Sequence, residues 1–258
     1  MISIASHENK TLKLIRSLQR KKGRSESGLY FAEGLRIAEE ALRFARQEIK
    51  CLIVSDVFAE KNKNFVNKLD ETGKTVYTAK ERLFQDVCNT ETPQGIGVVL
   101  HMPEPVQPRW ENMRFVLVLD GVSEPGNLGT IVRTAEAAGV DCVCLLKGCA
   151  DLYNPKTVRS TMGSIFRMQF MTGAESQVLE DMKACGFTVA ATALRDSVVI
   201  GEAKIPGRCA LVIGSEAAGV SESVLQAADL RVRIPMEGKV ESLNAAVAAG
   251  IAMYLLKP

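Results

Sequence analysis

The sequence is poor in residues that build metal centres and covalent cross-links. It has two histidines in 258 residues, and its seven cysteines include no C-x-x-C pair and no histidine at metal-ligand spacing. We therefore expect no bound metal. An odd number of unpaired cysteines also argues against a disulfide framework and favours a reducing, cytoplasmic setting. Cys142 and Cys144 alternate along an apolar run, so we predict core thiols on one face of a strand.

Long apolar segments are also missing. The first ten residues, MISIASHENK, have no apolar centre of the kind a signal peptide needs, so we expect no such peptide. The run from Ser242 to Leu256 has no charged residue. It is still shorter than the roughly 20 residues that cross a bilayer. We expect no membrane partner and predict a C-terminal helix that is buried by protein on all sides.

The common nucleotide-binding signatures are absent. The loop DGVSEPGNLGT, which begins at Asp120, is neither G-x-G-x-x-G nor G-x-x-x-x-G-K-[ST]. This argues against a dinucleotide-dependent dehydrogenase, which an α/β pattern alone would allow.

Positive charge is concentrated at the start of the chain, although the net charge is only +2. The first two dozen residues carry seven lysines and arginines against Glu8 alone. One interpretation is a basic arm that binds a polyanion. The other is a solvated amphipathic helix with Leu12, Ile15 and Leu18 turned inward. The charge pattern alone leaves both open.

The hydrophobic pattern predicts two α/β domains joined by a linker. Residues 1–101 form the smaller domain, with helices over 10–22 and 34–47 and strands at 49–55, 74–79 and 95–101. Three prolines predict an extended linker over 102–111. Residues 112–258 form the larger domain, with a helix from about Leu128 to Ala138 between short buried strands. We place these strands at 114–120, 141–146, 187–192, 209–214 and 230–235.

Alternating strands and helices predict a parallel sheet that is covered on both faces. Ligands bind such sheets at the carboxyl ends of the strands. The loops of interest therefore follow Asp120, Gly214 and Pro235.

Each of these loops carries polar residues that have a structural and a functional interpretation. Asn127 and Ser242 stand where helix N-caps are expected. Arg133 is either a surface residue or a ligand contact, and Glu216 caps a helix, orients an arginine or acts as a base. Asn244 lies in an otherwise apolar helix start and needs hydrogen-bond partners.

Taken together, the three loops resemble a known family. NLGTIVRTAEAAG, LVIGSEAAGVS and IPMEGKVESLNAAVAAGIAMYLL are similar, in order, to the three motifs of the SpoU/TrmH branch of the SPOUT methyltransferases. GLYFAEGLRIAEEAL and ETPQGIGVVL resemble that family's L7Ae/L30e-like substrate-binding domain. The resemblance covers nearly the whole chain. It implies a SPOUT domain with a deep trefoil knot and a homodimer with interfacial active sites. It also implies S-adenosylmethionine-dependent 2′-O-methylation of structured RNA, with 23S-type ribosomal RNA favoured.

The resemblance also assigns residues to roles. It ties five of them to catalysis: Asn127, Arg133, Glu216, Ser242 and Asn244. The cofactor pocket that it implies is lined by Thr192, Ala193, Ile213, Gly214, Gly219, Ile234, Met236 and Leu243. SEAAG departs from the more usual NEGxG of the second motif, which puts the local contacts of Ser215 and Ala217 in doubt.

RNA binding is expected in the N-terminal domain and its basic arm. The cations expected to meet phosphates are Arg16, Arg20, Lys21, Lys22 and Arg24. Two alternative functions stay open: a non-catalytic RNA-binding or ribosome-assembly factor that has kept the fold, and a tRNA 2′-O-methyltransferase.

Overall fold

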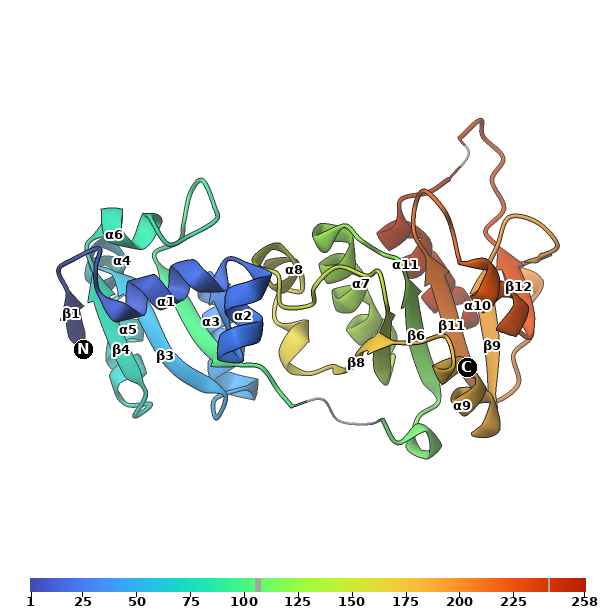
Figure 1. Cartoon of the computed structure of the whole chain (residues 1–258), viewed down its shortest axis with the longest axis horizontal. Coiled ribbons are helices and arrows are strands. Elements are labelled where there is room, and N and C mark those ends of the chain that lie inside the picture. Colours follow the sequence, from blue (N-terminus) through green and yellow to red (C-terminus); the bar gives the residue numbers. More distant parts are fainter. Residues whose placement is uncertain (105–107, 241) are drawn as a thin grey trace. The chain divides into compact units, whose positions relative to one another are not determined.

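The structure is a computed structural model that describes residues 1–104, 108–240 and 242–258. It contains two compact units (Figure 1). The first comprises 1–104 together with 153–166, and the second holds the remaining described residues. The predicted linker over 102–111 includes 105–107, which lie outside the described residues, so the predicted domain boundaries stay a prediction.

The first unit is built on a five-stranded sheet in the order β1-β4-β3-β5-β2, in which β5 runs antiparallel to β2 and β3. The strands are β1 (Ile2–Ile4), β2 (Leu29–Glu33), β3 (Ile49–Ser55), β4 (Thr75–Ala79) and β5 (Ile96–His101). The helices are α1 (Lys10–Leu18), α2 (Lys21–Ser27), α3 (Leu35–Phe44), α4 (Asp56–Lys61), α5 (Lys63–Asp70) and α6 (Glu81–Gln85).

Both faces of this sheet are covered. Leu12, Ile15 and Leu18 of α1 pack in one cluster with Cys51 and Ile53 of β3. The intervening Leu52 and Val54 point to the opposite face and are fully buried, where α3, α4 and α5 pack. The amphipathic-helix interpretation of the basic segment is therefore confirmed.

The chain leaves helical geometry between α1 and α2 at Arg20, whose backbone is extended with φ −105° and ψ 143°. A side chain at Gly23 would place a Cβ 2.1 Å from the carbonyl oxygen of Ser17, so only glycine lets α2 approach α1 this closely. The predicted single helix over 10–22 is therefore two helices.

A segment from the middle of the chain completes the first unit. Residues 153–166 contain α8 (Pro155–Ser160) and the 3₁₀ helix η2 (Ser164–Phe166), and α8 packs on β2. The ring of Tyr153 lies 4.8 Å from that of Tyr30, which is 3% exposed. Gly163 has a φ of +97° and lies against Glu40 of α3, where a Cβ would meet Glu40 Cγ at 2.7 Å. Our domain prediction assigned this segment to the larger domain, because its short helix carries no long-range signal.

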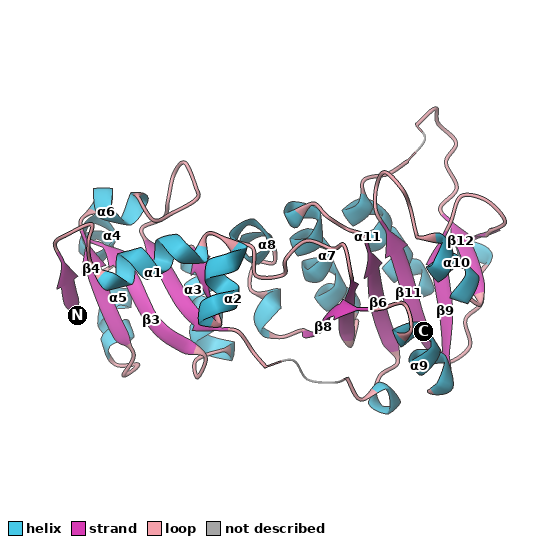
Figure 2. Ribbon diagram, in the orientation of Figure 1, coloured by secondary structure: helices cyan, strands magenta, loops and turns pink. Residues whose placement is uncertain are grey.

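The second unit is built on a sheet that includes β12, β9, β11 and β6 (Figure 2). The sheet has seven strands in the order β10-β12-β9-β11-β6-β7-β8. Its strands are β6 (Phe115–Asp120), β7 (Cys142–Leu146), β8 (Gln169–Ala174), β9 (Phe187–Thr192), β10 (Val198–Val199), β11 (Arg208–Gly214) and β12 (Leu230–Arg233). Its helices are η1 (Trp110–Asn112), α7 (Pro125–Ala138), α9 (Val178–Ala184), η3 (Ile200–Glu202), α10 (Glu222–Ala227) and α11 (Ala245–Leu256).

Every strand pair in this sheet is parallel, as predicted. Cys142 and Cys144 lie in the buried cluster on one face, which confirms them as core thiols. Burial raises the pKa of the Cys209 thiol to about 12, so this group stays protonated and unreactive at neutral pH. All seven cysteines are free. The trefoil knot stays a prediction.

Helix α11 is apolar but is not buried on all sides within one chain. It packs against α7, β11 and η3 (Figure 1). Ala249, Ala252 and Met253 are fully buried on this side. On another side Val247, Tyr254 and Leu255 are 51%, 61% and 53% exposed. Spacing of i, i+7 and i+8 places these three in one stripe along the helix.

Candidate active site

The candidate site lies where parallel strands end. Because β6, β9, β11 and β12 are neighbours and run in the same direction, the loops that follow them meet at one edge of the sheet. The register pairs Gly214 directly with Asp120, so the loops after β11 and β6 start side by side.

The loop after β6 leads into α7, and its cap is not the predicted one. The carboxylate of Glu124 accepts a hydrogen bond from the backbone N–H of Asn127, so Glu124 is the N-cap and Asn127 is the third residue of the helix. Pro125 fits at the first helical position because its missing N–H has no partner to lose. The side chain of Asn127 is thereby released from capping.

The loop before α11 also uses a different cap. Asn244, not Ser242, caps this helix, and its Oδ1 accepts from the backbone N–H groups of Ala246 at 3.0 Å and Val247 at 3.4 Å. Ser242 is exposed and follows residue 241, which lies outside the described residues.

The loop after β11 is a tight turn that carries Glu216. Ser215 and Gly219 exchange two backbone hydrogen bonds of 3.0 Å, which close the turn around Glu216. Gly219 has a φ of +70°, and the backbone of Gly219 passes so close to Gly214 that a Cβ there would lie 2.0 Å from the Gly219 carbonyl carbon. Glu216 does not cap α10, because Ser221 occupies the N-cap position.

Three of the five predicted catalytic residues meet. The Nδ2 of Asn244 donates to Oδ1 of Asn127 at 3.0 Å and to Oε2 of Glu216 at 3.4 Å. We call Asn127, Glu216 and Asn244 the amide cluster. It joins the loops after β6 and β11 to the start of α11.

Arg133 does not join the amide cluster within one chain. It is exposed and makes no hydrogen bond or ion pair with a described residue. At 100° per residue it lies about 120° around α7 from Asn127. Its face of the helix also carries the exposed Thr130 and Ala137, and neighbouring Thr134 lies against Gly250 of α11.

Asp120 also belongs to the site, although the sequence marks it only as the start of a loop. Its Oδ2 accepts from the backbone N–H of Ser221 at 2.7 Å, which ties the end of β6 to the end of the Glu216 turn. A carboxylate at the last position of a buried strand was the signal that could have identified it.

The predicted cofactor residues line the same edge of the sheet. They lie at the ends of β9 and β11, after β12 or before α11. Most of them are partly buried; Ile213 and Gly214 are buried, and Gly219 is exposed. The backbone groups of residues 234–240 and 242–243, the described part of the last loop, form no hydrogen bond with another described residue. The buried hydroxyl of Ser197 in the loop after β9 also has no partner among the described residues.

These features fit an adenosyl ligand. Half-buried Ile234, Met236 and Leu243 offer apolar contact to a flat ring, and unpaired peptide groups offer donors and acceptors to its edge. In the described parts of the chain, no three His, Cys, Asp or Glu side chains are grouped to hold a metal ion.

Comparison with models of known protein families shows which family the chain belongs to. A sequence model of the SpoU rRNA Methylase family matches residues 114–254. The chain belongs to the SpoU rRNA methylase family. This confirms the resemblance seen in the three loops and the predicted fold class.

Other SpoU proteins match over the full length of the chain. The 23S rRNA (guanosine(2553)-2′-O)-methyltransferase RlmP of Bacillus subtilis is 38% identical over 257 residues, which cover 100% of both proteins. An AdoMet-bound rRNA methyltransferase from Sinorhizobium meliloti has a TM-score of 0.84 at 30% identity, covering 98% of this chain and 95% of that one. The AdoMet complex of AviRb from Streptomyces viridochromogenes has a TM-score of 0.81 at 26% identity, covering 96% of each chain.

The N-terminal part of this SpoU protein matches the MRM3-like substrate binding domain over residues 9–97. This match includes all five cations that we predicted to bind RNA. Arg20, Lys21 and Lys22 are exposed at the corner between α1 and α2.

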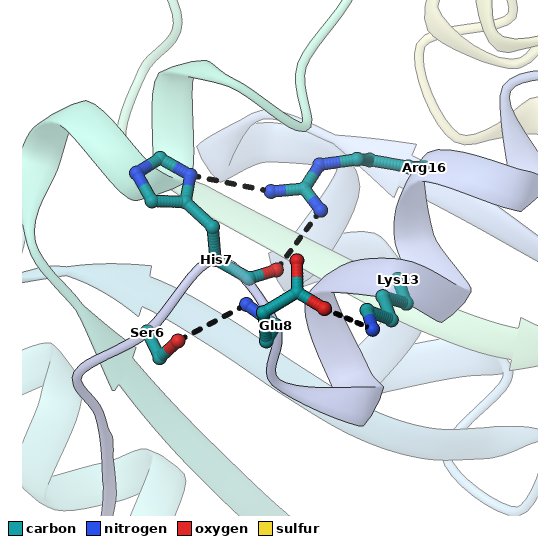
Figure 3. A network of polar contacts seen from close by, with 5 residues as sticks. All are labelled: Ser6, His7, Glu8, Lys13 and Arg16. Carbon is teal, nitrogen blue, oxygen red and sulfur yellow. Dashed lines mark hydrogen bonds and ion pairs between the residues drawn. The ribbon is translucent and has the colours of Figure 1, made fainter.

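The other two predicted cations are engaged with the protein. Arg16 donates to the carbonyl oxygen of His7 at 3.0 Å and lies 3.4 Å from His7 Nδ1 (Figure 3). In the same network Lys13 pairs with Glu8, whose backbone N–H donates to Ser6 Oγ. Arg24 is only 2% exposed and donates to the carbonyl oxygen of Leu18 at 2.8 Å. We therefore withdraw Arg24 from the predicted phosphate contacts, because its guanidinium holds the α1–α2 corner.

The described parts of the chain include no helix with the length and apolar character that crossing a bilayer requires.

Proposed function

We propose that this SpoU protein methylates the 2′-oxygen of one ribose in 23S-type ribosomal RNA, with S-adenosylmethionine as its methyl donor. The observation that carries the proposal is similarity over the whole length to a 23S rRNA 2′-O-methyltransferase, with substrate-binding and catalytic parts both included. Reaction class and cofactor follow from the family. The choice of 23S-type rRNA as substrate is taken from the similarity to RlmP of Bacillus subtilis. The guanosine equivalent to position 2553, which that protein's name gives, is the first nucleotide to test.

The cofactor supplies a methyl group activated by a sulfonium leaving group. Thr192, Gly214, Ile234, Met236 and Leu243 are proposed to hold it against the carboxyl ends of β9, β11 and β12. The protein's main task is then to place the ribose hydroxyl in line with the transferred group, which alone supplies several kcal/mol.

Arg133 is proposed to clamp an RNA phosphate and the oxygen that gains negative charge. A guanidinium stays protonated in proteins, so it is a poor base but a strong bidentate donor. The hydroxyl proton must leave before the oxygen attacks, because the oxygen carries negative charge only after it has lost that proton. Phosphate, water or the free Oε1 of Glu216 accepts it. Ser242 is proposed to contact the methyl donor or the ribose.

We infer that the active protein is a homodimer. The exposed stripe Val247, Tyr254 and Leu255 runs along α11, which packs against α7, so the stripe and the Arg133 face belong to adjacent helices. Arg133 has no partner among the described residues and lies about 120° around α7 from Asn127. A second copy seated on the stripe would cover apolar surface and bring Arg133 of the partner subunit to the site.

RNA binding is proposed for the exposed cations at the α1–α2 corner. We expect Lys21→Glu with Lys22→Glu to weaken binding of an unmodified 23S rRNA fragment. The plot of log association constant against log salt concentration has a negative slope. Its magnitude should decrease by about 0.7–0.9 for each phosphate that the variant no longer neutralises, as measured by filter binding over a salt series. The matched control is Lys63→Glu with Lys68→Glu, which makes the same charge change at exposed positions of α5. Equal weakening in both variants would mean that only net charge matters.

The test of the function is a map of 2′-O-methyl groups in total RNA from cells with and without the protein. We expect one methylated ribose to disappear from 23S rRNA, at the guanosine equivalent to position 2553, and to be restored by the wild-type gene. A site that disappears from tRNA would instead support the tRNA enzyme, and an unchanged map would support the non-catalytic binder. The proposed cytoplasmic setting follows from the ribosomal substrate and fits the seven free thiols.

A further inference from the structure

The orientation of the Asn244 side chain is fixed by chemistry. The backbone N–H groups of Ala246 and Val247 can only donate, so the atom of Asn244 that faces them must be the oxygen. The amide cannot flip without leaving both donors unpaired at the first turn of α11. Its nitrogen therefore always faces the rest of the amide cluster.

All of the hydrogen-bonding capacity of Asn244 is used within the protein. Oδ1 accepts two backbone hydrogen bonds, and Nδ2 donates one hydrogen to Asn127 and one to Glu216. A carboxamide has two donors and an acceptor with two lone pairs, so nothing remains for a substrate.

The orientation of Asn244 then dictates that of Asn127. Because Nδ2 of Asn244 can only donate, the atom of Asn127 that faces it must be Oδ1. The Nδ2 of Asn127 consequently points away from Asn244, and its two hydrogens have no partner among the described residues. Asn127 is half-buried on α7, so this donor is held on a rigid element.

Glu216 is held in a complementary way. One carboxylate oxygen accepts from Asn244, while the other is exposed and makes no hydrogen bond with the described residues. The amide cluster thus presents a fixed donor from Asn127 beside a free acceptor from Glu216.

We propose that Asn127 is the catalytic member of the asparagine pair, whose Nδ2 donates to the RNA oxygen that gains negative charge, and that Asn244 is a positioning residue that never touches RNA. The proposal rests on the proposed function. A preorganised donor aimed at a developing oxyanion stabilises the transition state more than the ground state, so its removal lowers the rate more than the affinity.

The test is a double-mutant cycle on the full chain with Asn127→Ala and Asn244→Ser. Serine keeps an N-cap oxygen for α11 but cannot reach Asn127. We expect Asn127→Ala to lower the single-turnover rate at saturating RNA and S-adenosylmethionine by about 10²–10³-fold, with KM little changed. Adding Asn244→Ser to Asn127→Ala should cause a smaller decrease than Asn244→Ser causes alone, because Asn244 acts through Asn127 and, to a lesser extent, through Glu216. Multiplicative decreases would overturn the assignment, since they mean that Asn244 contacts substrate itself.

A second readout does not depend on catalysis. In protein labelled with ¹⁵N-asparagine, an unmodified 23S rRNA fragment should shift the side-chain amide signal of Asn127 and leave that of Asn244 in place. The control is Asn112→Ser, an exposed site in the same unit, which should change neither rate nor signals. A shifted Asn127 signal without methylation would reject the proposed reaction but keep the donor. Methylation together with a shifted Asn244 signal would support the proposed reaction but reject Asn244 as a residue that never touches RNA.

Discussion

Replacing Gly214 with alanine is expected to abolish binding of S-adenosylmethionine and methyl transfer. The new Cβ would lie 2.0 Å from the carbonyl carbon of Gly219 and 2.2 Å from the nitrogen of Val220, which are backbone atoms that cannot rotate away. Gly214 itself has an ordinary φ, so the effect is steric and comes from the returning turn. To relieve the clash, the Glu216 turn must move off the sheet edge.

The displaced turn affects each part of the site. Glu216 would leave Asn244, and the hydrogen bond from Ser221 to Asp120 would lengthen. Overpacking at a tight contact costs about 1–3 kcal/mol in the free energy of unfolding, so the variant should fold but melt earlier. Calorimetric titration with S-adenosylmethionine and a thermal melt measure the two effects.

Gly238→Ala is the matched control for this prediction. Gly238 lies in the loop before α11, and a Cβ there meets nothing within 4 Å. We expect a melting temperature close to that of the wild type. If Gly214→Ala bound the cofactor with unchanged affinity, the close approach of the two glycines would not matter for the site.

The second large effect is expected from charge placed on the exposed stripe of α11. Tyr254→Asp with Leu255→Asp should convert a dimer into a monomer of 28.0 kDa, because two unpaired carboxylates cost several kcal/mol each when buried in an apolar interface. Sedimentation equilibrium gives the mass, and a single-turnover assay at saturating RNA gives the rate. We expect the rate to fall at least 100-fold, as each site is deprived of Arg133 of the partner subunit.

Two controls make this prediction specific. Phe44→Asp changes an apolar residue of similar exposure, 43%, in α3 of the other unit and should leave the mass unchanged. Mixing two inactive proteins, Arg133→Ala and Asn127→Ala, should restore activity if a site takes these residues from different chains. A wild-type protein that is monomeric and fully active would falsify the dimer inference.

The sequence predicted the secondary elements that are governed by local pattern. The five predicted strands of the larger domain lie within two residues of the observed ones, because buried parallel strands are short apolar runs with turn residues at both ends. Strands β1, β2, β8 and β10 were missed. β1 and β10 have only three and two residues, and Gly34 alone separates β2 from α3. β8 is only partly buried, so its hydrophobic pattern is weak.

The sequence predicted which loops meet, but not which of their side chains contact one another. Parallel strands guarantee that the loops after Asp120, Gly214 and Pro235 meet at one edge, and the family motifs supply Asn127, Glu216 and Asn244. Serine and asparagine cap helices almost equally well, so the choice of Asn244 over Ser242 depends on where the loop turns. The burial of Arg24 and the contact between Asn127 and Asn244, 117 positions apart, are tertiary facts with no local signal.

Residues 153–166 have a consequence for how this protein can be cut and recombined. Because this segment belongs to the first unit, the chain passes from one unit to the other three times, after residues 104, 152 and 166. A fragment that ends at residue 104 would leave the Tyr30 ring and the surface of α3 beside Glu40 without their cover. An exchange of the RNA-recognition half between two such enzymes must therefore carry this internal segment along, since a single crossover at the linker would join parts that were never fitted to each other.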